Sequence, residues 1–161
     1  MPKTKATVFT QLEALGFKME LKDKTAVITG GSGGIGKAMA KAFIEEGARG
    51  IVLADLDKGA LDAAALELNC EFIVCNVTDE KQVADLAKYA AEKFGQIDLF
   101  CSNAGAGGEG VLTDATNDVW QNQWELHVMS HVYAARAVLP QMIDRGEGYL
   151  LNTASAAGLL A

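Results

Sequence analysis

The residues best suited to chemistry lie in a glycine-rich segment, Gly30–Gly36, in which five of seven residues are glycine. The apolar run Ala26–Thr29 precedes this segment and predicts a buried strand, and the run Ile35–Glu46 predicts a helix. Glycines allow a tight turn and let a ligand approach the backbone, because no Cβ stands in the way. The free N–H groups of the first helical turn then face an anion. Such a turn predicts a phosphate site, most often for the pyrophosphate of a dinucleotide.

The glycine spacing in this segment fits two patterns. Gly31, Gly33 and Gly36 satisfy GxGxxG, whereas Gly30, Gly34 and Gly36 satisfy TGxxxGxG. Either pattern alone is weak, since glycine is common in turns. The strand before it and the helix after it favour nucleotide binding over a purely structural turn.

An acidic residue, Asp55, ends the second predicted strand, about 20 residues past the glycines, where dinucleotide sites carry an acid. A carboxylate there can accept hydrogen bonds from both hydroxyls of an adenosine ribose and would repel a 2′-phosphate. No basic residue occupies the glycine-rich segment, so the sequence predicts NAD rather than NADP. The alternative is that Asp55 caps the following helix, although Asp57 is better placed for that role.

Two further predicted strand ends carry small polar residues. Asn76 and Val77 follow the third strand, where the Asn76 amide could both donate to and accept from the edge of an adenine. Asn103, Ala104 and Gly105 follow the fourth strand, where small residues let the chain pass close to the ribose and the nicotinamide. On spacing alone, ordinary turns explain both segments as an alternative.

The elements that must position these residues alternate regularly along the chain. Short apolar runs predict strands buried on both faces, and longer helical stretches lie between them. This alternation predicts an α/β fold, a Rossmann-like doubly wound parallel sheet of five strands. The predicted strands are Ala26–Thr29, Ile51–Ala54, Phe72–Cys75, Ile97–Cys101 and Tyr149–Asn152, and the predicted helices are Ile35–Glu46, Leu56–Leu68, Asp79–Phe94 and Asn117–Asp144.

Several residues mark where the predicted helices begin and end. Asp57 and Thr78 are candidate N-caps, because their side-chain oxygens can accept from the first free N–H groups. Gly47 and Gly95 are suited to end the first and third helices. Pro140 is expected to bend or end the last one, since it lacks an N–H.

Taken together, these segments resemble the short-chain dehydrogenase/reductases, in the subgroup with the TGxxxGxG loop. The resemblance covers about residues 22–161 and rests on five motifs in register, which is far more specific than any one motif. It implies a Rossmann fold, a nicotinamide cofactor, and hydride transfer between an alcohol and a carbonyl. The motifs are Thr29-Gly30-x-x-x-Gly34-Ile35-Gly36, Asp55, Asn76-Val77, Asn103-Ala104-Gly105 and Asn152-Thr153-Ala154-Ser155-Ala156-Ala157-Gly158.

The resemblance also implies roles for residues. Ser155 matches the family's catalytic serine, whose hydroxyl would hydrogen-bond the substrate oxygen and stabilise charge developing there. No metal site is predicted. The predicted cofactor-binding residues are Gly30, Ser32, Gly33, Gly34, Ile35, Gly36, Asp55, Leu56, Asn76, Val77, Asn103, Ala104 and Gly105.

The chain departs from the family pattern at the expected acid/base. The family has a tyrosine with a lysine four residues later, in a YxxxK motif about a dozen residues past the serine, and a tyrosine needs a nearby cation to act near neutrality. The chain ends at Ala161, six residues past Ser155. Tyr89 has a lysine four residues later, Lys93, but this pair lies before the serine, and neither Tyr133 nor Tyr149 has such a lysine. We therefore expect a C-terminally truncated chain, inactive without the missing segment, in which Tyr149–Asn152 forms an exposed edge.

A second departure lies in the long fourth helix, where the family usually has an asparagine that orders a water. That position holds His127. An imidazole there could hold a water or relay a proton, so His127 is a candidate catalytic residue. The alternative is a core histidine whose hydrogen bonds are satisfied by the protein.

Composition limits the partners. A net charge of −7 argues against a nucleic-acid or anionic-membrane partner, and no apolar run approaches the roughly 20 residues that cross a bilayer. The cysteines Cys70, Cys75 and Cys101 lack CxxC spacing and predict buried free thiols in a cytoplasmic setting. The resemblance implies a small-molecule alcohol or carbonyl substrate and a full-length homodimer or homotetramer. Residues 1–20 are expected to form an N-terminal extension to a dinucleotide-binding domain over residues 21–161.

Two other functions remain open on the sequence. A nucleotide-binding protein without catalysis would also have this fold, and His127 together with the missing tyrosine–lysine pair would be its signature. A methyltransferase also uses a glycine-rich first turn and an acid after the second strand. Its cofactor has no pyrophosphate, however, and does not require the segments at Asn103 and Ser155.

Overall fold

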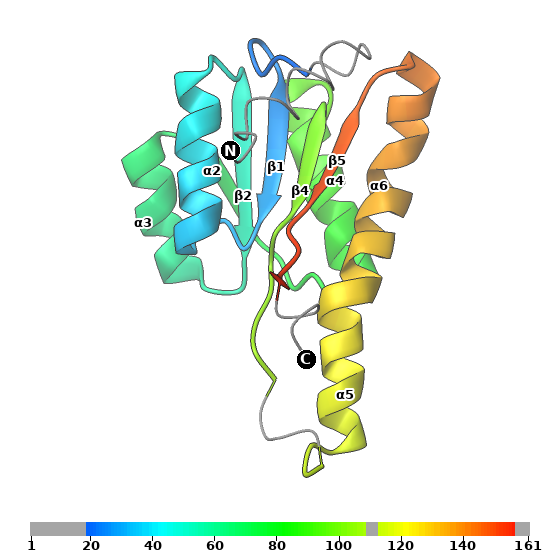
Figure 1. Cartoon of the computed structure of the whole chain (residues 1–161). Coiled ribbons are helices and arrows are strands. Elements are labelled where there is room, and N and C mark those ends of the chain that lie inside the picture. The colour runs from blue at the N-terminus through cyan, green and yellow to red at the C-terminus, as the bar shows by residue number, and fades with distance from the viewer. Residues whose placement is uncertain (1–18, 109–112, 157–161) are drawn as a thin grey trace, which may run out of the picture.

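The computed structural model describes residues 19–108 and 113–156 of the chain. Its five strands form one parallel sheet in the order β3-β2-β1-β4-β5, with helices on both faces (Figure 1). The predicted doubly wound α/β fold is confirmed. The elements are β1 (Thr25–Thr29), α2 (Gly34–Glu45), β2 (Gly50–Asp55), α3 (Lys58–Leu68), β3 (Glu71–Val74), α4 (Glu80–Phe94), β4 (Leu99–Ser102), α5 (Asn117–Trp124), the π-helical turn η1 (Glu125–Met129), α6 (Ser130–Arg145) and β5 (Tyr149–Asn152).

The chain changes direction across the sheet between β1 and β4. It runs from the central strand β1 outward through β2 to the edge strand β3, and then returns to the other side of β1 to add β4 and β5. At such a reversal the loops after the two central strands turn to opposite faces, which opens a crevice at their carboxyl ends. This crevice is where the predicted site residues of both loops meet.

Two apolar layers hold the helices on the sheet, because successive side chains of a buried strand point to opposite faces. On β1, Ala26 and Ile28 pack with residues of α2 and α3, such as Ala40 and Leu61. Val27 points the other way and packs with residues of α4 and α6. The sheet is thus covered on both sides around its central strands, as a continuous apolar run such as Ala26–Ile28 requires.

The outer strands differ from the prediction. Burial on both faces is correct for β1 and β4, whose residues are all buried, but wrong for β3 and β5. Both lie at edges of the described sheet. Tyr149 and Leu151 of β5 are exposed, which agrees with the exposed edge predicted at Tyr149–Asn152. Ile97 is buried but precedes β4 instead of belonging to it.

The helix ends follow local hydrogen bonding. Asp57 caps α3 by accepting from the Ala60 N–H, as predicted. The predicted cap Thr78 is wrong, because Asp79 caps α4 by accepting from the N–H groups of Lys81 and Gln82. Two carboxylate oxygens can serve two donors, which one hydroxyl does less well.

The predicted helix Asn117–Asp144 is a continuous helical stretch with two irregularities. It widens into a π-helical turn at η1, and it continues through Pro140 inside α6. Val138 and Met142, on either side of the proline, are buried in the core with residues of α4 and the sheet. This burial holds the last turns helical although the proline removes one hydrogen bond.

The amino-terminal edge of the sheet is closed by a buried carboxylate. Asp98 is 1% exposed and accepts hydrogen bonds from the Thr25 N–H at 2.8 Å and from the Gln96 amide. The guanidinium groups of Arg49 and Arg145 lie 3.7 and 4.0 Å from its oxygens. Arg145 also donates to the Ile97 carbonyl. These bonds join the starts of β1 and β4 to the end of α6.

Candidate active site

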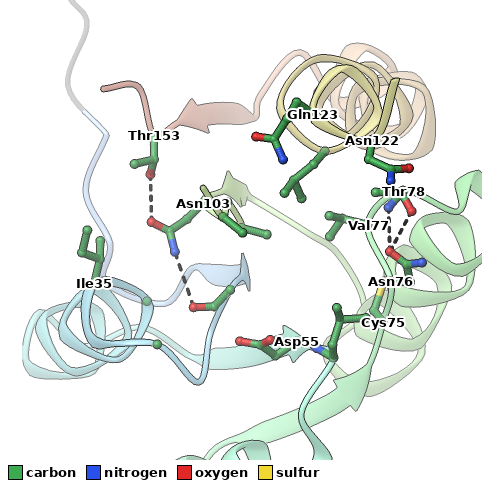
Figure 2. A pocket seen from close by; sticks show the side chains of 18 of the residues that line it. Ile35, Asp55, Cys75, Asn76, Val77, Thr78, Asn103, Asn122, Gln123 and Thr153 are labelled. Carbon is green, nitrogen blue, oxygen red and sulfur yellow. Dashed lines mark hydrogen bonds between the residues drawn. The ribbon is translucent and has the colours of Figure 1, made fainter. Parts of the chain in front are cut away.

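A cavity of about 620 Å³ opens at the carboxyl-terminal edge of the sheet, where the segments that follow all five strands converge. Its volume lies within the range of about 300–1,000 Å³ that is typical of ligand sites. All predicted cofactor-binding residues line it except Ser32. Figure 2 shows it from close by, with Asp55 opposite the helix that carries Asn122 and Gln123.

The glycines of the first loop fall into two groups. Some are required by the fold: a Cβ on Gly36 would lie 2.2 Å from the Gly30 carbonyl oxygen, and Gly30 has a φ of +62°. Gly34 is different, because a Cβ built there meets no protein atom within 4 Å. It opens α2 and borders the cavity, next to Gly33. The fold therefore leaves a space beside the first N–H groups of the helix that a ligand can enter.

The carboxylate of Asp55 is held in place by its neighbours. One oxygen accepts from both the hydroxyl and the N–H of Ser32, at 2.6 and 3.2 Å. The other accepts from the Leu56 N–H at 2.8 Å. Ser32 thus belongs to the site although it does not line the cavity. An anchored carboxylate at a strand end is suited to accept hydrogen bonds from a diol, because its remaining lone pairs are fixed in direction.

A chain of hydrogen bonds ties three strand ends together beneath the cavity. The Thr29 hydroxyl accepts from the N–H groups of Asn103 and Ala104, at 2.9 and 3.1 Å. The Asn103 amide nitrogen donates to the Thr29 carbonyl at 3.0 Å. The Asn103 side-chain oxygen accepts from the Thr153 hydroxyl at 3.0 Å (Figure 2). The ends of β1, β4 and β5 are therefore fixed to one another at the cavity floor.

The side-chain amide of Asn76, which follows β3, has its oxygen engaged by the protein. The Asn76 side-chain oxygen accepts from both the N–H and the hydroxyl of Thr78, at 3.1 and 2.9 Å (Figure 2). Of the expected amide pair, the oxygen is thus engaged by the protein, which leaves the amide nitrogen as the group that could serve a ligand. The neighbouring thiol, Cys75, also lines the cavity. Burial, followed by the charges of Asp79 and Asp85, raises its pKa to about 11, so it is protonated and a poor nucleophile at neutral pH.

Comparisons with known proteins agree with this geometry. The profile of the short chain dehydrogenase family matches residues 24–161. The chain belongs to this family. An uncharacterized oxidoreductase of Staphylococcus aureus is 36% identical over 141 residues, which are 86% of this chain and 61% of that protein. A crystal structure of a short chain dehydrogenase/reductase from Burkholderia phymatum in complex with NAD is 36% identical, with a TM-score of 0.83 over 89% of this chain and 53% of that one. NAD⁺-bound xylitol dehydrogenase is 32% identical, with a TM-score of 0.79 over 88% and 56% of the two chains.

The chain therefore spans about 61% of the length of the curated oxidoreductase relatives that it matches. Among the described residues, no group of histidine, cysteine and acidic side chains is placed to hold a metal ion. None of the described helices is long and apolar enough to cross a membrane.

The two predicted catalytic residues of this short chain dehydrogenase lie outside the cavity lining. Ser155 is exposed, two residues past Thr153, which does line the cavity. His127 lies in η1, and its Nε2 is 2.9 Å from the Ala106 carbonyl oxygen and 3.1 Å from the Gln123 side-chain oxygen. In this structure the imidazole thus contacts the protein and is not part of the cavity lining.

Sequence reasoning missed one wall of the cavity. Asn122, Gln123 and Leu126 line it from α5 and η1. Their spacing of three to four residues places them on one helix face, which is a usable signal. The two tryptophans of α5, Trp120 and Trp124, are each 53% exposed and do not line it.

Proposed function

We propose that this chain binds NAD and carries the cofactor-binding part of an oxidoreductase that interconverts an alcohol and a carbonyl. The observation that carries the proposal is the empty space above Gly34, beside the first N–H groups of α2 and in the same cavity as Asp55. The fold alone gives no reason for glycine there. A pyrophosphate beside these N–H groups supplies one.

The residues of the cavity fit the parts of a dinucleotide. The N–H groups at Gly34, Ile35 and Gly36 would hold the pyrophosphate, since they begin a helix and lack earlier partners within it. Asp55 would accept hydrogen bonds from the adenosine ribose. Leu56, which is 67% exposed, and Val77 offer apolar contacts to the adenine. Asn103, Ala104 and Gly105 would lie beneath the nicotinamide side.

The same lining favours NAD over NADP. A 2′-phosphate would lie against the Asp55 carboxylate and needs a cation to offset the repulsion. Among the described residues that line the cavity there is no lysine or arginine. We therefore propose NAD as the cofactor of this chain.

The bound nicotinamide would donate or accept the hydride. Ser155 would hydrogen-bond the substrate oxygen and stabilise its developing charge. The general acid/base of the family is a tyrosine activated by a lysine four residues later, about a dozen residues past the serine. Tyr89 and Lys93 have this spacing, but they lie on α4, before Ser155, and do not line the cavity. We propose that catalysis needs the family's pair past the serine and that the 161 residues alone bind cofactor without turnover.

Calorimetric titration of the chain with NADH, NADPH and S-adenosylmethionine tests this function. We expect NADH to bind, NADPH to bind at least tenfold more weakly, and S-adenosylmethionine not to bind. Asp55→Asn should lower NADH affinity about tenfold, because a charge-assisted hydrogen bond contributes roughly 1.5–3 kcal/mol. Ser32→Ala should lower it less, because the carboxylate stays but loses its anchor.

The matched control for these variants is Asp62→Asn, which removes an exposed carboxylate of α3 that pairs with Lys58. It should leave the affinity unchanged. Absence of NADH binding by the unmodified chain would refute the proposed function. Binding by the chain combined with inactivity of the longer gene product would favour a nucleotide-binding protein without catalysis.

We also propose that the protein forms a homodimer or homotetramer through the helical stretch α5–α6. This stretch carries exposed large apolar side chains: Trp120, Trp124 and Ile143 are 53%, 53% and 71% exposed. Exposed side chains of this kind favour an association surface, since large aromatic side chains are enriched at the centre of interfaces. Trp124→Glu should shift the species seen by sedimentation velocity towards monomer.

A further inference from the structure

The imidazole of His127 connects the helical stretch to the loop that follows β4. Its Nε2 lies 2.9 Å from the Ala106 carbonyl oxygen, across 21 residues of sequence, and 3.1 Å from the side-chain oxygen of Gln123, one turn earlier. Both partners are oxygen acceptors. Nε2 therefore carries the hydrogen, and the ring is the Nε2–H tautomer or the doubly protonated form.

The loop packs closely against the same helix face. A Cβ on Gly105 would lie 3.1 Å from Cε1 of His127 and 3.5 Å from its Nδ1. A Cβ on Gly108 would lie 3.4 Å from Cδ of Gln123. Glycine at position 105 thus lets the backbone lie against the imidazole, whereas a Cβ on Gly108 would make only an ordinary van der Waals contact with Gln123. Gly105, Ala106 and Gln123 all line the cavity, so the position of this contact determines the shape of one wall.

The π-helical turn gives this part of the helix its register. Residues Glu125–Met129 form η1, and the Ser130 hydroxyl donates to the Leu126 carbonyl at 2.6 Å. Tyr133 donates to the Glu125 carboxylate at 3.0 Å. A π-turn rotates the residues that follow it relative to those before it, and such turns are frequent at functional sites. His127 lies at the centre of this turn.

We propose that His127 is a positioning residue that latches Gly105–Gly108 onto the helix through Nε2–H, and so fixes the cavity wall on the nicotinamide side. This assignment rests on the proposed function for the identity of the ligand, but the latch itself does not depend on it. It differs from a proton relay, in which the ring would pass a proton between its two nitrogens. The bond to Ala106 needs one nitrogen as a permanent donor.

Glutamine and asparagine at position 127 distinguish the latch from a water-ordering role, because their amides reach different places. The amide nitrogen of glutamine can occupy the place of Nε2, whereas the shorter asparagine places its amide near Nδ1. The latch therefore predicts that His127→Gln retains the loop position and that His127→Asn loses it. A residue that serves only to order a water, as the family's asparagine does, predicts the reverse order. His127→Phe keeps a ring without a donor and should behave as His127→Asn does.

The first test needs no variant. Nitrogen-15 correlation spectra of the imidazole at neutral pH should show that the neutral form of His127 is the Nε2–H tautomer. Backbone amide exchange at Gly107 and Gly108 should be about fivefold faster in His127→Phe and His127→Asn than in the unmodified chain, as expected for the loss of one hydrogen bond. It should stay within about twofold in His127→Gln. His131→Phe, at the other histidine of the chain, is the matched control and should change neither rate.

NADH titration then links the latch to the cavity. We expect affinity to fall about fivefold in the asparagine and phenylalanine variants and to be retained in the glutamine variant. An Nδ1–H tautomer, or exchange and affinity better preserved by asparagine than by glutamine, would overturn the proposal. If the unmodified chain does not bind NADH, the proposed function fails, whereas the tautomer and the exchange rates still decide whether the latch exists.

Discussion

The two ends of the parallel sheet differ in how their carboxylates are surrounded. At the amino-terminal edge, Asp98 is buried and its oxygens face donors from Thr25, Gln96, Arg49 and Arg145. At the carboxyl-terminal edge, Asp55 is anchored on one side and borders a cavity of about 620 Å³ on the other. Both edges hold a carboxylate, but one is enclosed by the protein and the other is left able to bind something else.

The difference shows how one sheet can be both stable and open. Buried polar groups are tolerated where protein partners satisfy them, as at Asp98. Loops after parallel strands leave polar groups at the other edge, and small residues there keep the space clear. Substitutions at the two edges should therefore separate effects on folding from effects on binding.

Gly36→Ala should have the largest effect, because it disturbs both properties. Its Cβ would lie 2.2 Å from the Gly30 carbonyl oxygen, so the loop must move. We expect a loss of about 3 kcal/mol or more in unfolding free energy together with the loss of NADH binding. Urea denaturation and calorimetry measure the two quantities. An alanine variant with unchanged stability would show that the loop conformation is wrong.

Asp98→Ala should affect folding alone. It leaves the buried Thr25 N–H without its acceptor, which costs about 2 kcal/mol in unfolding free energy. NADH affinity of the folded fraction should not change, because the substitution lies at the far edge of the sheet. The matched control is Asp62→Ala at an exposed ion pair, for which a change below about 0.5 kcal/mol is expected. A drop in affinity for Asp98→Ala would contradict the separation of the two edges.

Gly34→Ala should affect binding alone. A Cβ at this position meets no other part of the fold within 4 Å, so the methyl group causes no steric clash in the folded protein. Alanine also has a higher helix propensity than glycine. We expect stability to stay equal or rise by up to about 1 kcal/mol, while NADH affinity falls about tenfold, because the methyl group occupies the space next to the helix N–H groups. Equal affinity of the two proteins would place the pyrophosphate elsewhere.

Tyr89→Phe should have the smallest effect, visible only through pH. The Tyr89 hydroxyl donates to Glu71 at the start of β3, and this bond is the main cause that lowers the pKa of Glu71 below its ordinary value of 4.5, followed by Lys93. A carboxyl with a lowered pKa stabilises the fold above its ordinary value, and this contribution disappears as pH falls through the lowered pKa.

The variant should therefore be less stable by under about 1 kcal/mol at pH 7, and the difference should shrink as pH falls below 4.5 and through the lowered pKa of Glu71. Urea midpoints at pH 7 and at a series of acidic pH values give the comparison, with exposed Tyr149 as the control position for a phenylalanine substitution. A difference that does not shrink with falling pH would mean that the Tyr89 ring packing, and not the carboxylate, is responsible.

The alternation of strands and helices was predictable because it depends on local patterns. The apolar run Ala26–Thr29 has no polar interruption, and Asp57 stands one residue before its helix, so both were found from sequence. Features decided by tertiary packing were not. The continuation of α6 through Pro140 depends on burial of Val138 and Met142, and the π-turn at η1 leaves no mark in hydrophobic periodicity.

The candidate site was predicted where a backbone conformation or a strand end fixes the residue. Gly34 and Asp55 are of this kind. The bonds of Thr153 to Asn103 join segments 50 residues apart, and Gln123 reaches the cavity only because the helix lies over the loop after β4. Such pairings depend on the final arrangement of elements, which no single segment encodes.

The three cysteine thiols of the chain offer a way to measure how often different parts of the sheet open locally. Cys75 and Cys101 are buried and Cys70 is partly so, and burial raises their pKa values to about 11, 12 and 11. A maleimide reagent reacts with thiolate, so each cysteine should be modified only during the moments when its surroundings open. Cys101 lies in the inner strand β4, whereas Cys70 immediately precedes the edge strand β3. The ratio of their labelling rates would measure how much more often the structure opens locally near the edge strand β3 than at the inner strand β4.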